Sequence, residues 1–228
     1  MSEISVEKPA ILLSGGQPVD YDIIKAITAP AFAGRNNPKV AYIGAANGDR
    51  AAFFDTLNTL LLLAGAAEVN FVRLARDRID AGAARETLTE SDAIFLSGGE
   101  VEDGIKWINK HGLDGCLKEL YRIGVQFIGI SAGAIMMGAN WVRWSTPGDD
   151  ETAELFDCLG FVPVTFDTHA EDEDWIELKT ALRLMGDGAR GCAIPRGGII
   201  SADSRGNIRN IVNKYLTYVY KDGEYQIS

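Results

Sequence analysis

Ser131 lies in a run of small residues, Gly129-Ile130-Ser131-Ala132-Gly133, that could make it a catalytic nucleophile. Residues 125–128 just before it predict a buried strand, and residues 132–138 predict the start of a helix. A serine on a sharp strand-to-helix turn exposes its hydroxyl, and the flanking glycines allow the turn and close helix packing. The amide of Ala132 would then point to where a tetrahedral oxyanion forms. An ordinary serine in a glycine-rich turn is the alternative interpretation.

A serine nucleophile needs a base, and the chain contains two histidines, His111 and His169. His111 lies in a polar segment beside a glycine, which is typical of a solvated helix end. His169 follows an alternating apolar run, residues 161–166, that predicts a strand. Open α/β sheets gather their reactive groups at the carboxyl ends of strands. We therefore expect His169 to be the general base for Ser131.

A second glycine turn supplies a candidate oxyanion donor. Ala93-Ile94-Phe95-Leu96 predicts a buried strand that runs into Ser97-Gly98-Gly99-Glu100, and residues 101–109 predict a helix. Paired glycines at a strand end let the backbone approach a ligand and leave N–H groups free. A tight turn is the default interpretation, but one strand away from a nucleophile turn Gly99 becomes a candidate donor to the oxyanion.

The order of these groups argues against an α/β-hydrolase, although that fold also uses a G-x-S-x-G turn. There the acid and the histidine follow later strands, and the short interval from Ser131 to His169 leaves little room for those units. Strands and helices nevertheless alternate along most of the chain, which is typical of a largely parallel sheet covered by helices on both faces. The predicted strands are Ala10–Leu13, Val40–Ile43, Val69–Leu74, Ile94–Leu96, Val125–Ile128 and Val162–Phe166, and the predicted helices include Tyr21–Thr28, Ala51–Ala64, Leu113–Ile123 and Trp175–Met185.

The end of the chain differs from the rest. Segments 208–212, 216–220 and 224–227 predict short strands, with the turn dipeptide Asp222-Gly223 between the last two. We expect an antiparallel β appendage that covers an edge of the sheet, although its tyrosines could instead close the site or make a dimer contact. The predicted fold class is thus α/β, with one domain over residues 1–228.

Composition narrows the class of protein. The chain has 228 residues, 46% of them hydrophobic, which suffices for one large core. Its net charge of −10 gives no general attraction to nucleic acid or to an anionic membrane. The N-terminus has no secretion signal, and the longest apolar stretch, Leu57 to Ala67, is too short to span a bilayer. We therefore expect a cytoplasmic enzyme that contacts neither a membrane nor a nucleic acid.

Cysteine spacing argues against a disulfide framework or a zinc site. Cys116, Cys158 and Cys192 are widely separated, and none has a histidine partner nearby in the sequence. We expect reduced thiols in the core and no metal or organic cofactor. Trp141, Trp144 and Trp175, which bracket the proposed catalytic segment, would be either core residues or part of a substrate pocket.

These motifs resemble the dipeptidase E and cyanophycinase family of serine peptidases, which has a class I glutamine-amidotransferase-like α/β sandwich with serine in place of the usual cysteine. The resemblance implies that Ser131 is the nucleophile, His169 the base, and the Gly99 and Ala132 amides the oxyanion hole. It extends from about residue 11 to about residue 201 and is carried by Leu13-Ser14-Gly15-Gly16, Val40-Ala41-Tyr42-Ile43-Gly44-Ala45-Ala46, Leu96-Ser97-Gly98-Gly99, Gly129-Ile130-Ser131-Ala132-Gly133-Ala134, Phe156-Asp157-Cys158-Leu159-Gly160-Phe161-Val162-Pro163 and Ile194-Pro195-Arg196-Gly197-Gly198.

The chain departs from the family pattern at several positions. Glu100 replaces the usual asparagine, Thr168 the proline before the histidine, and Arg196 a common glutamate. Aspartyl dipeptidases of the family hold an acidic side chain with an arginine beyond the histidine. Here four carboxylates, residues 171–174, follow instead, and the next arginine is Arg183. Like charge would repel an anionic substrate, which argues against aspartyl-dipeptidase specificity.

Acidic residues are the candidates for two further roles. The resemblance implies a triad carboxylate between nucleophile and histidine, where Asp149, Asp150 and Glu151 lie. Spacing does not single out one of the three, and we favour Asp149 or Asp150 as the group that orients His169. A solvated acidic loop is the alternative for these residues. Glu100, Asp172 and Asp174 are candidate substrate contacts that would favour cationic side chains.

The expected function is hydrolysis of an amide bond in a small peptide by way of an acyl-enzyme, with a homodimer as a possible assembly. One alternative is cyanophycinase-like cleavage of an arginine-bearing isopeptide. The other is a catalytically silent family member that binds a ligand.

Overall fold

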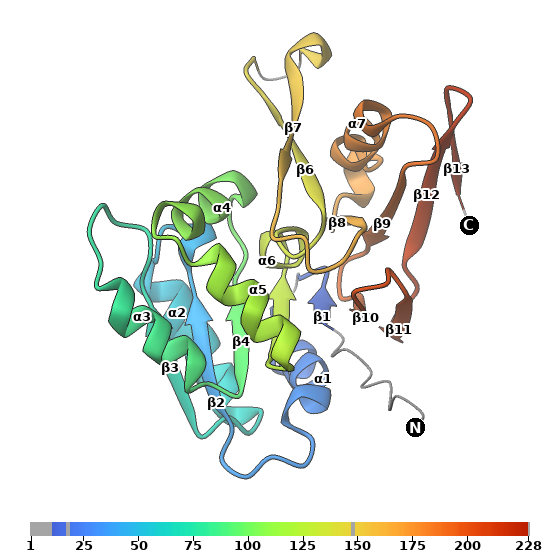
Figure 1. The fold of residues 1–228 in the computed structure, drawn as a ribbon. Coiled ribbons are helices and arrows are strands. Elements are labelled where there is room, and N and C mark those ends of the chain that lie inside the picture. The colour runs from blue at the N-terminus through green and yellow to red at the C-terminus, as the bar shows by residue number, and fades with distance from the viewer. Residues whose placement is uncertain (1–10, 17–18, 147–148, 228) are drawn as a thin grey trace, which may run out of the picture.

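The computed structural model describes residues 11–16, 19–146 and 149–227, and its centre is a seven-stranded sheet (Figure 1). The strand order is β11-β10-β1-β5-β4-β2-β3. The strands from β1 to β3 in this order run parallel, whereas β10 and β11 add to the edge in antiparallel pairs. The strands of the sheet are β1 (Ile11–Ser14), β2 (Lys39–Ile43), β3 (Glu68–Val72), β4 (Ala93–Leu96), β5 (Gln126–Ile130), β10 (Ile199–Ala202) and β11 (Ile208–Val212).

Helices cover both faces of this sheet, as the sequence predicts. In β2, the buried Val40 and Tyr42 pack in one core cluster with residues of the first two helices. Ala41 and Ile43 face the opposite way and pack with residues of the next three helices. The period of two along a strand thus divides the core into two layers. The helices are α1 (Tyr21–Phe32) and α2 (Ala51–Leu63) on one face, and α3 (Ala81–Thr89), α4 (Val101–Lys110) and α5 (Asp114–Ile123) on the other.

A second sheet, in the order β13-β12-β9-β8, lies beside the first (Figure 1). The helix α7 (Ile176–Met185) packs on it through Leu178 and Leu182. The apolar run at 162–166 is a strand only from Thr165 onward, because residues 160–162 instead donate backbone hydrogen bonds to Met137 and Gly138. The strands of this sheet are β8 (Thr165–Thr168), β9 (Arg190–Ile194), β12 (Leu216–Lys221) and β13 (Glu224–Ile227).

The C-terminal strands are antiparallel, as expected, but they divide between the two sheets: β11 extends the central sheet, whereas β12 and β13 belong to the second. A hairpin that the sequence reading missed, β6 (Asn140–Trp144) and β7 (Ala153–Asp157), projects from the body (Figure 1). Its short strands flank the segment for which the sequence offered an acidic loop as an alternative. In the described part of the chain, no helix is both long and apolar enough to cross a bilayer.

Close packing fixes the short helix α6 (Ala132–Ile135) between the sheets. A Cβ atom on Gly133 would overlap the carbonyl group of Leu96 at the end of β4. A Cβ atom on Gly129 would likewise overlap Gly133 and the tip of Met137. The small residues around Ser131 therefore let α6 approach two strand ends at backbone distance.

We expect Gly133→Ala to lower the free energy of unfolding by about 2 kcal/mol or more, because backbone atoms must shift to admit the new methyl group. Gly115→Ala is the matched control, since nothing lies within 4 Å of the added Cβ atom and the site is inside α5. That control should be neutral or stabilising by up to about 1 kcal/mol. Urea unfolding of both variants tests the claim, and equal stabilities would contradict it.

Candidate active site

Ser131 occupies a strained turn between β5 and α6. Its backbone has φ 54° and ψ −125°, a region that non-glycine residues rarely adopt. The amide of Ser131 donates a hydrogen bond to the carbonyl oxygen of Ser14 at the end of β1, 3.0 Å away. The carbonyl of Ser131 accepts hydrogen bonds from Ala134 and Ile135 in α6. Neighbouring elements thus hold the turn on both sides, and the hydroxyl stays at the C-terminal end of β5.

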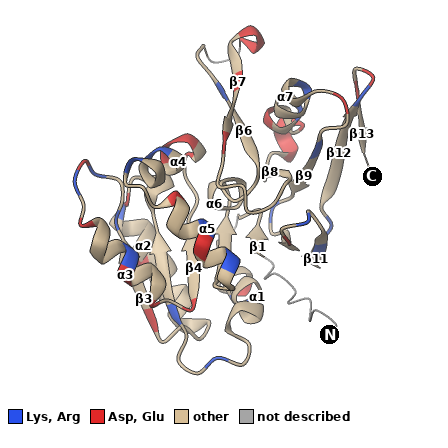
Figure 2. Cartoon of the chain, in the orientation of Figure 1, with Lys and Arg blue, Asp and Glu red and all other residues tan. Residues whose placement is uncertain are grey.

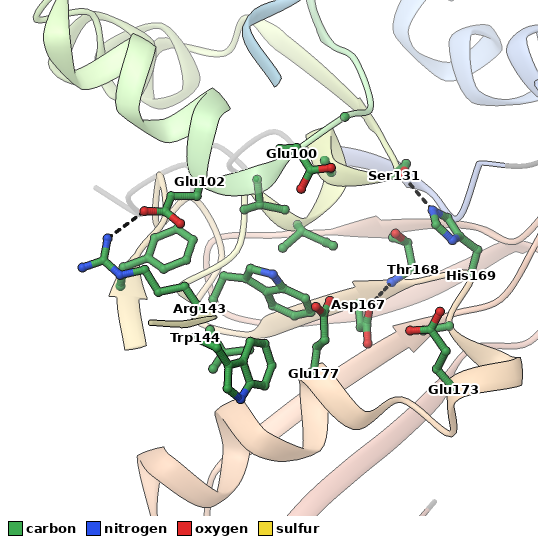
Figure 3. Close-up of a pocket in the computed structure, with 18 residues that line it drawn as sticks. Glu100, Glu102, Ser131, Arg143, Trp144, Asp167, Thr168, His169, Glu173 and Glu177 are labelled. Carbon is green, nitrogen blue, oxygen red and sulfur yellow. Dashed lines mark hydrogen bonds and ion pairs between the residues drawn. The ribbon is translucent and has the colours of Figure 1, made fainter. Parts of the chain in front are cut away.

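His169 follows β8 directly, so it reaches Ser131 from the second sheet. Its Nε2 atom lies 2.7 Å from the Ser131 Oγ atom (Figure 3). The residue has φ 47°, and its amide donates to the carbonyl of Ile194 in β9, 3.0 Å away. The structure thus brings together the serine and the histidine that the sequence selects, within hydrogen-bond reach.

The other histidine has a structural place. His111 ends α4, and its Nε2 atom lies 2.9 Å from the carbonyl oxygen of Leu74 and 3.0 Å from that of Arg76. Two cavities border Ser131, and His111 lines neither of them. This agrees with its expected position at a helix end.

Gly99 and Ala132, the expected oxyanion donors, line one cavity together with Ser131. Ala132 is the first residue of α6, so its N–H has no carbonyl partner within the helix. Gly99 adopts φ 143°, and a Cβ atom there would overlap the carbonyl group of Ala46. A Cβ atom on Gly98 would lie 3.1 Å from that of Ser131. The paired glycines therefore allow the β4–α4 turn to lie against the nucleophile.

Asn47, which the sequence reading did not select, holds this turn. Its Nδ2 atom donates to Ser97 Oγ at 2.7 Å and to the Gly98 carbonyl at 3.2 Å, while its Oδ1 atom accepts from Arg50. The C=O and N–H groups of a trans peptide point in opposite directions. Holding the Gly98 carbonyl on Asn47 therefore directs the Gly99 N–H away from Asn47. A polar residue in the turn after a predicted buried strand was the available signal.

A cavity of about 300 Å³ opens beside the Ser131–His169 pair (Figure 3). The expected contact Glu100 lines it, and so do Trp144 and the largely buried Trp141, whereas Trp175 packs in the core with α7. Glu173, from the acidic run 171–174, also lines it. So do three acidic residues that were not predicted, Glu102, Asp167 and Glu177, of which Asp167 precedes the histidine by two residues.

The other expected acids lie outside this lining. Asp172 pairs with Arg196 at 2.7 Å, and Asp174 pairs with Lys179 at 2.7 Å. Asp150 lies at the hairpin tip, 3.4 Å from a nitrogen of Arg183. These three carboxylates are therefore already neutralised by basic side chains.

No carboxylate bonds to His169 in the described structure. The Asp149 side chain accepts from the amide of Glu151 at 3.1 Å and caps a short 3₁₀ turn that starts at Asp150. No described side chain hydrogen-bonds to the His169 Nδ1 atom. Arg196, which stands where the family has glutamate, directs its amide to Glu171 and its guanidinium to Asp172.

Among the acids that line the cavity, Asp167 has a pKa far above its ordinary value. Its side chain is 2% exposed; one oxygen accepts from the Thr168 amide at 2.7 Å, and the other has no partner. Burial, with smaller contributions from the charges of Glu177 and Glu173, raises the pKa of Asp167 to about 7. Burial and the like charges of Glu173 and Glu100 also raise the pKa of Glu177.

Asp167→Asn should remove part of the pH dependence of stability. Because the folded state binds this proton more tightly than the unfolded state, Asp167 destabilises the fold as pH rises from about 4 to about 7. A pKa raised from 3.8 to about 7 corresponds to at most about 4 kcal/mol. Urea unfolding at several pH values should show the variant gaining stability over the parent protein across this range. A constant difference would contradict the assignment.

Comparisons with known proteins identify the family and the fold of the chain. The model of peptidase family S51 matches residues 10–204. A peptidase from an acI-B1 Actinobacterium has a similar structure, with a TM-score of 0.70 and 19% identity, covering 96% of this chain and 93% of that one. A candidate peptidase E protein from Listeria monocytogenes EGD-e gives a TM-score of 0.64 at 16% identity, covering 89% and 98%. No curated protein matches.

These two structures share the α/β fold predicted from the sequence. The family match covers most of the chain and includes both Ser131 and His169. It confirms the resemblance to the dipeptidase E group and supports a peptidase function. The chain belongs to peptidase family S51.

Proposed function

We propose that the protein is a serine peptidase that cleaves an amide bond in small peptides by way of an acyl-enzyme. The observation that carries this proposal is the 2.7 Å contact between Ser131 Oγ and His169 Nε2 on a strained turn. Membership of a peptidase family supports the class of reaction. The small size of the cavity beside the pair, about 300 Å³, supports a small substrate.

In this mechanism the Ser131 Oγ atom attacks the scissile carbonyl carbon while His169 Nε2 takes the hydroxyl proton. The carbonyl oxygen becomes an oxyanion, to which the N–H groups of Gly99 and Ala132 donate. His169 then gives its proton to the leaving amine as the C–N bond breaks. Water hydrolyses the remaining ester with His169 again as base, and Ser131 regains its proton.

The imidazolium that forms in the first step needs negative charge nearby. Glu173 lines the same cavity as His169, and its charge would stabilise the imidazolium through space; Asp167, whose pKa is raised to about 7, adds to this when it is ionised. The amide of His169, bonded to Ile194, fixes the backbone from which the ring projects. This arrangement differs from a triad in which a carboxylate accepts the Nδ1 proton.

The test is the rate at which a fluorophosphonate adds one phosphonyl group, followed by intact mass. The parent protein should gain a single adduct, Ser131→Ala none, and His169→Ala should react at least about a hundredfold more slowly. His111→Ala is the matched control, because His111 bonds only the carbonyls of Leu74 and Arg76.

His111→Ala should react at the parental rate. A folded parent protein that gains no adduct would contradict the proposal and favour a catalytically silent member that binds a ligand. So would labelling that persists in Ser131→Ala.

Asn47→Asp should slow the same reaction by about ten- to a hundredfold, since it keeps the acceptor for Arg50 but loses the donor to Gly98. The loss should appear in the maximal rate of phosphonylation and not in the concentration of half-saturation, because Asn47 positions a donor that acts in the transition state. Asn140→Asp, on the hairpin, is the matched control. An unchanged maximal rate in folded Asn47→Asp would contradict this role.

A further inference from the structure

Besides Glu102, which pairs with Arg143, four carboxylates converge on the cavity beside Ser131 from different elements. Glu100 is the N-cap residue at the N-terminal end of α4, and Asp167 lies in β8. Glu173 ends the short 3₁₀ turn after His169, and Glu177 lies in the first turn of α7. Figure 2 shows acidic residues, in red, near the start of α7 and in the region of α4. Figure 3 shows Glu100 across the cavity from Asp167, Glu173 and Glu177.

These carboxylates form no ion pair with any described residue, unlike the paired acids Asp172 and Asp174 close by. Arg143, the one arginine or lysine among the described residues of the lining, lies between Glu102 and Glu154, which hold its guanidinium at 2.9 and 2.7 Å. The cavity therefore has an excess of negative charge that the described chain leaves unbalanced.

The burial of two of these acids makes this excess significant. Glu100 and Glu173 are exposed, Glu177 is half-buried, and Asp167 is buried with one oxygen that has no hydrogen-bond partner. A buried polar atom without a partner destabilises the fold. The pKa values of Asp167 and Glu177 are both raised, as expected where carboxylates share a site without a cation.

Aromatic side chains complete the lining. Trp141, Trp144 and Phe156 border the same cavity. The faces of aromatic rings attract cations, and tryptophan does so most strongly. Carboxylates and aromatic rings together are the groups that bind an ammonium or a guanidinium.

We propose that this acidic cavity is the subsite for a cationic group of the substrate, an ammonium or a guanidinium, bound by Glu100, Asp167, Glu173 and Glu177. The proposal rests on the peptidase function proposed above and names its substrate class. The cation belongs either to a lysine or arginine side chain or to a free N-terminus.

A second cavity indicates what occupies the other side of the scissile bond. It measures about 590 Å³, shares Gly99, Ser131 and His169 with the acidic cavity, and carries no carboxylate in its lining. Its remaining wall is mostly apolar: Val19, Ala52, Phe53, Leu57 and Ile130, with Gly16, Thr56 and Gly98. Ser131 thus lies between an acidic and an apolar cavity, and a peptide that joins a cationic to an apolar residue fits both.

Binding to the Ser131→Ala protein, measured by calorimetry, tests the subsite without needing turnover. The probes are Lys-Leu and norleucine-Leu, each with a free and an acetylated N-terminus, and the same four in the reverse order. We expect peptides with a cation at the recognised position to bind at least about tenfold more tightly than acetyl-norleucine-Leu. If acetyl-Lys-Leu or acetyl-Leu-Lys keeps this tighter binding, the cation that the subsite recognises is the side chain. If free norleucine-Leu or Leu-norleucine keeps it, the cation is the N-terminus.

The double variant Glu173→Gln with Glu177→Gln, in the same Ser131→Ala background, should reduce this preference to less than about threefold. Asp172→Asn with Asp174→Asn is the matched control, because it also removes two negative charges but from outside the cavity lining. The control should keep the preference of the parent protein.

Any of three results would overturn the subsite proposal. The Ser131→Ala protein could show no preference for a cationic peptide, the Glu173→Gln, Glu177→Gln variant could keep the full preference, or the Asp172→Asn, Asp174→Asn control could lose it. Phosphonylation of the parent protein is scored separately. A protein that labels at Ser131 but shows no cation preference keeps the proposed function and refutes the subsite.

Discussion

One hydrogen bond, between Ser131 Oγ and His169 Nε2, joins two sheets that share no strand. Its 2.7 Å length requires the C-terminal end of β5, in the seven-stranded sheet, and the C-terminal end of β8 to lie within side-chain reach of each other. The glycines around Ser131 serve this approach, since α6 could not pack against Leu96 with a larger residue at position 133. Both Ser131 and His169 have positive φ, and strain of this kind persists only where surrounding contacts enforce it. Ser14 and Ile194 supply those contacts through backbone hydrogen bonds.

The same junction sets the electrostatics of the site. The β4–α4 turn brings Gly99 and Glu100 to one side of Ser131, while β8 and α7 bring Asp167 and Glu177 to the other. Amide donors and carboxylates therefore share one small cavity. The amides suit a developing oxyanion, whereas the carboxylates suit a cation elsewhere on the substrate. A substrate that satisfies both must carry its positive charge close to the carbonyl that is attacked.

Local patterns in the sequence were enough to predict the α/β fold, the serine turn and the choice of His169, because each depends on residues near one another in the chain. Asp149 and Asp150 were chosen by their place between nucleophile and base, yet the chain carries them out on a hairpin, where Asp150 pairs with Arg183. The cavity acids were missed because Glu177 faces inward only once α7 has packed on the second sheet. Asn47 was missed for a similar reason, since its partners Ser97 and Gly98 lie in the turn after β4, far from it in the sequence.

The central claim is that Ser131, His169 and the two amides act on one reacting carbonyl. A crystal structure of the protein after reaction with a fluorophosphonate tests it most directly, because the adduct mimics the tetrahedral intermediate. We expect phosphorus on Ser131 Oγ and the phosphonyl oxygen about 2.7–3.1 Å from the amides of both Gly99 and Ala132. A phosphonyl oxygen directed away from both amides, or an adduct on another residue, would contradict the account.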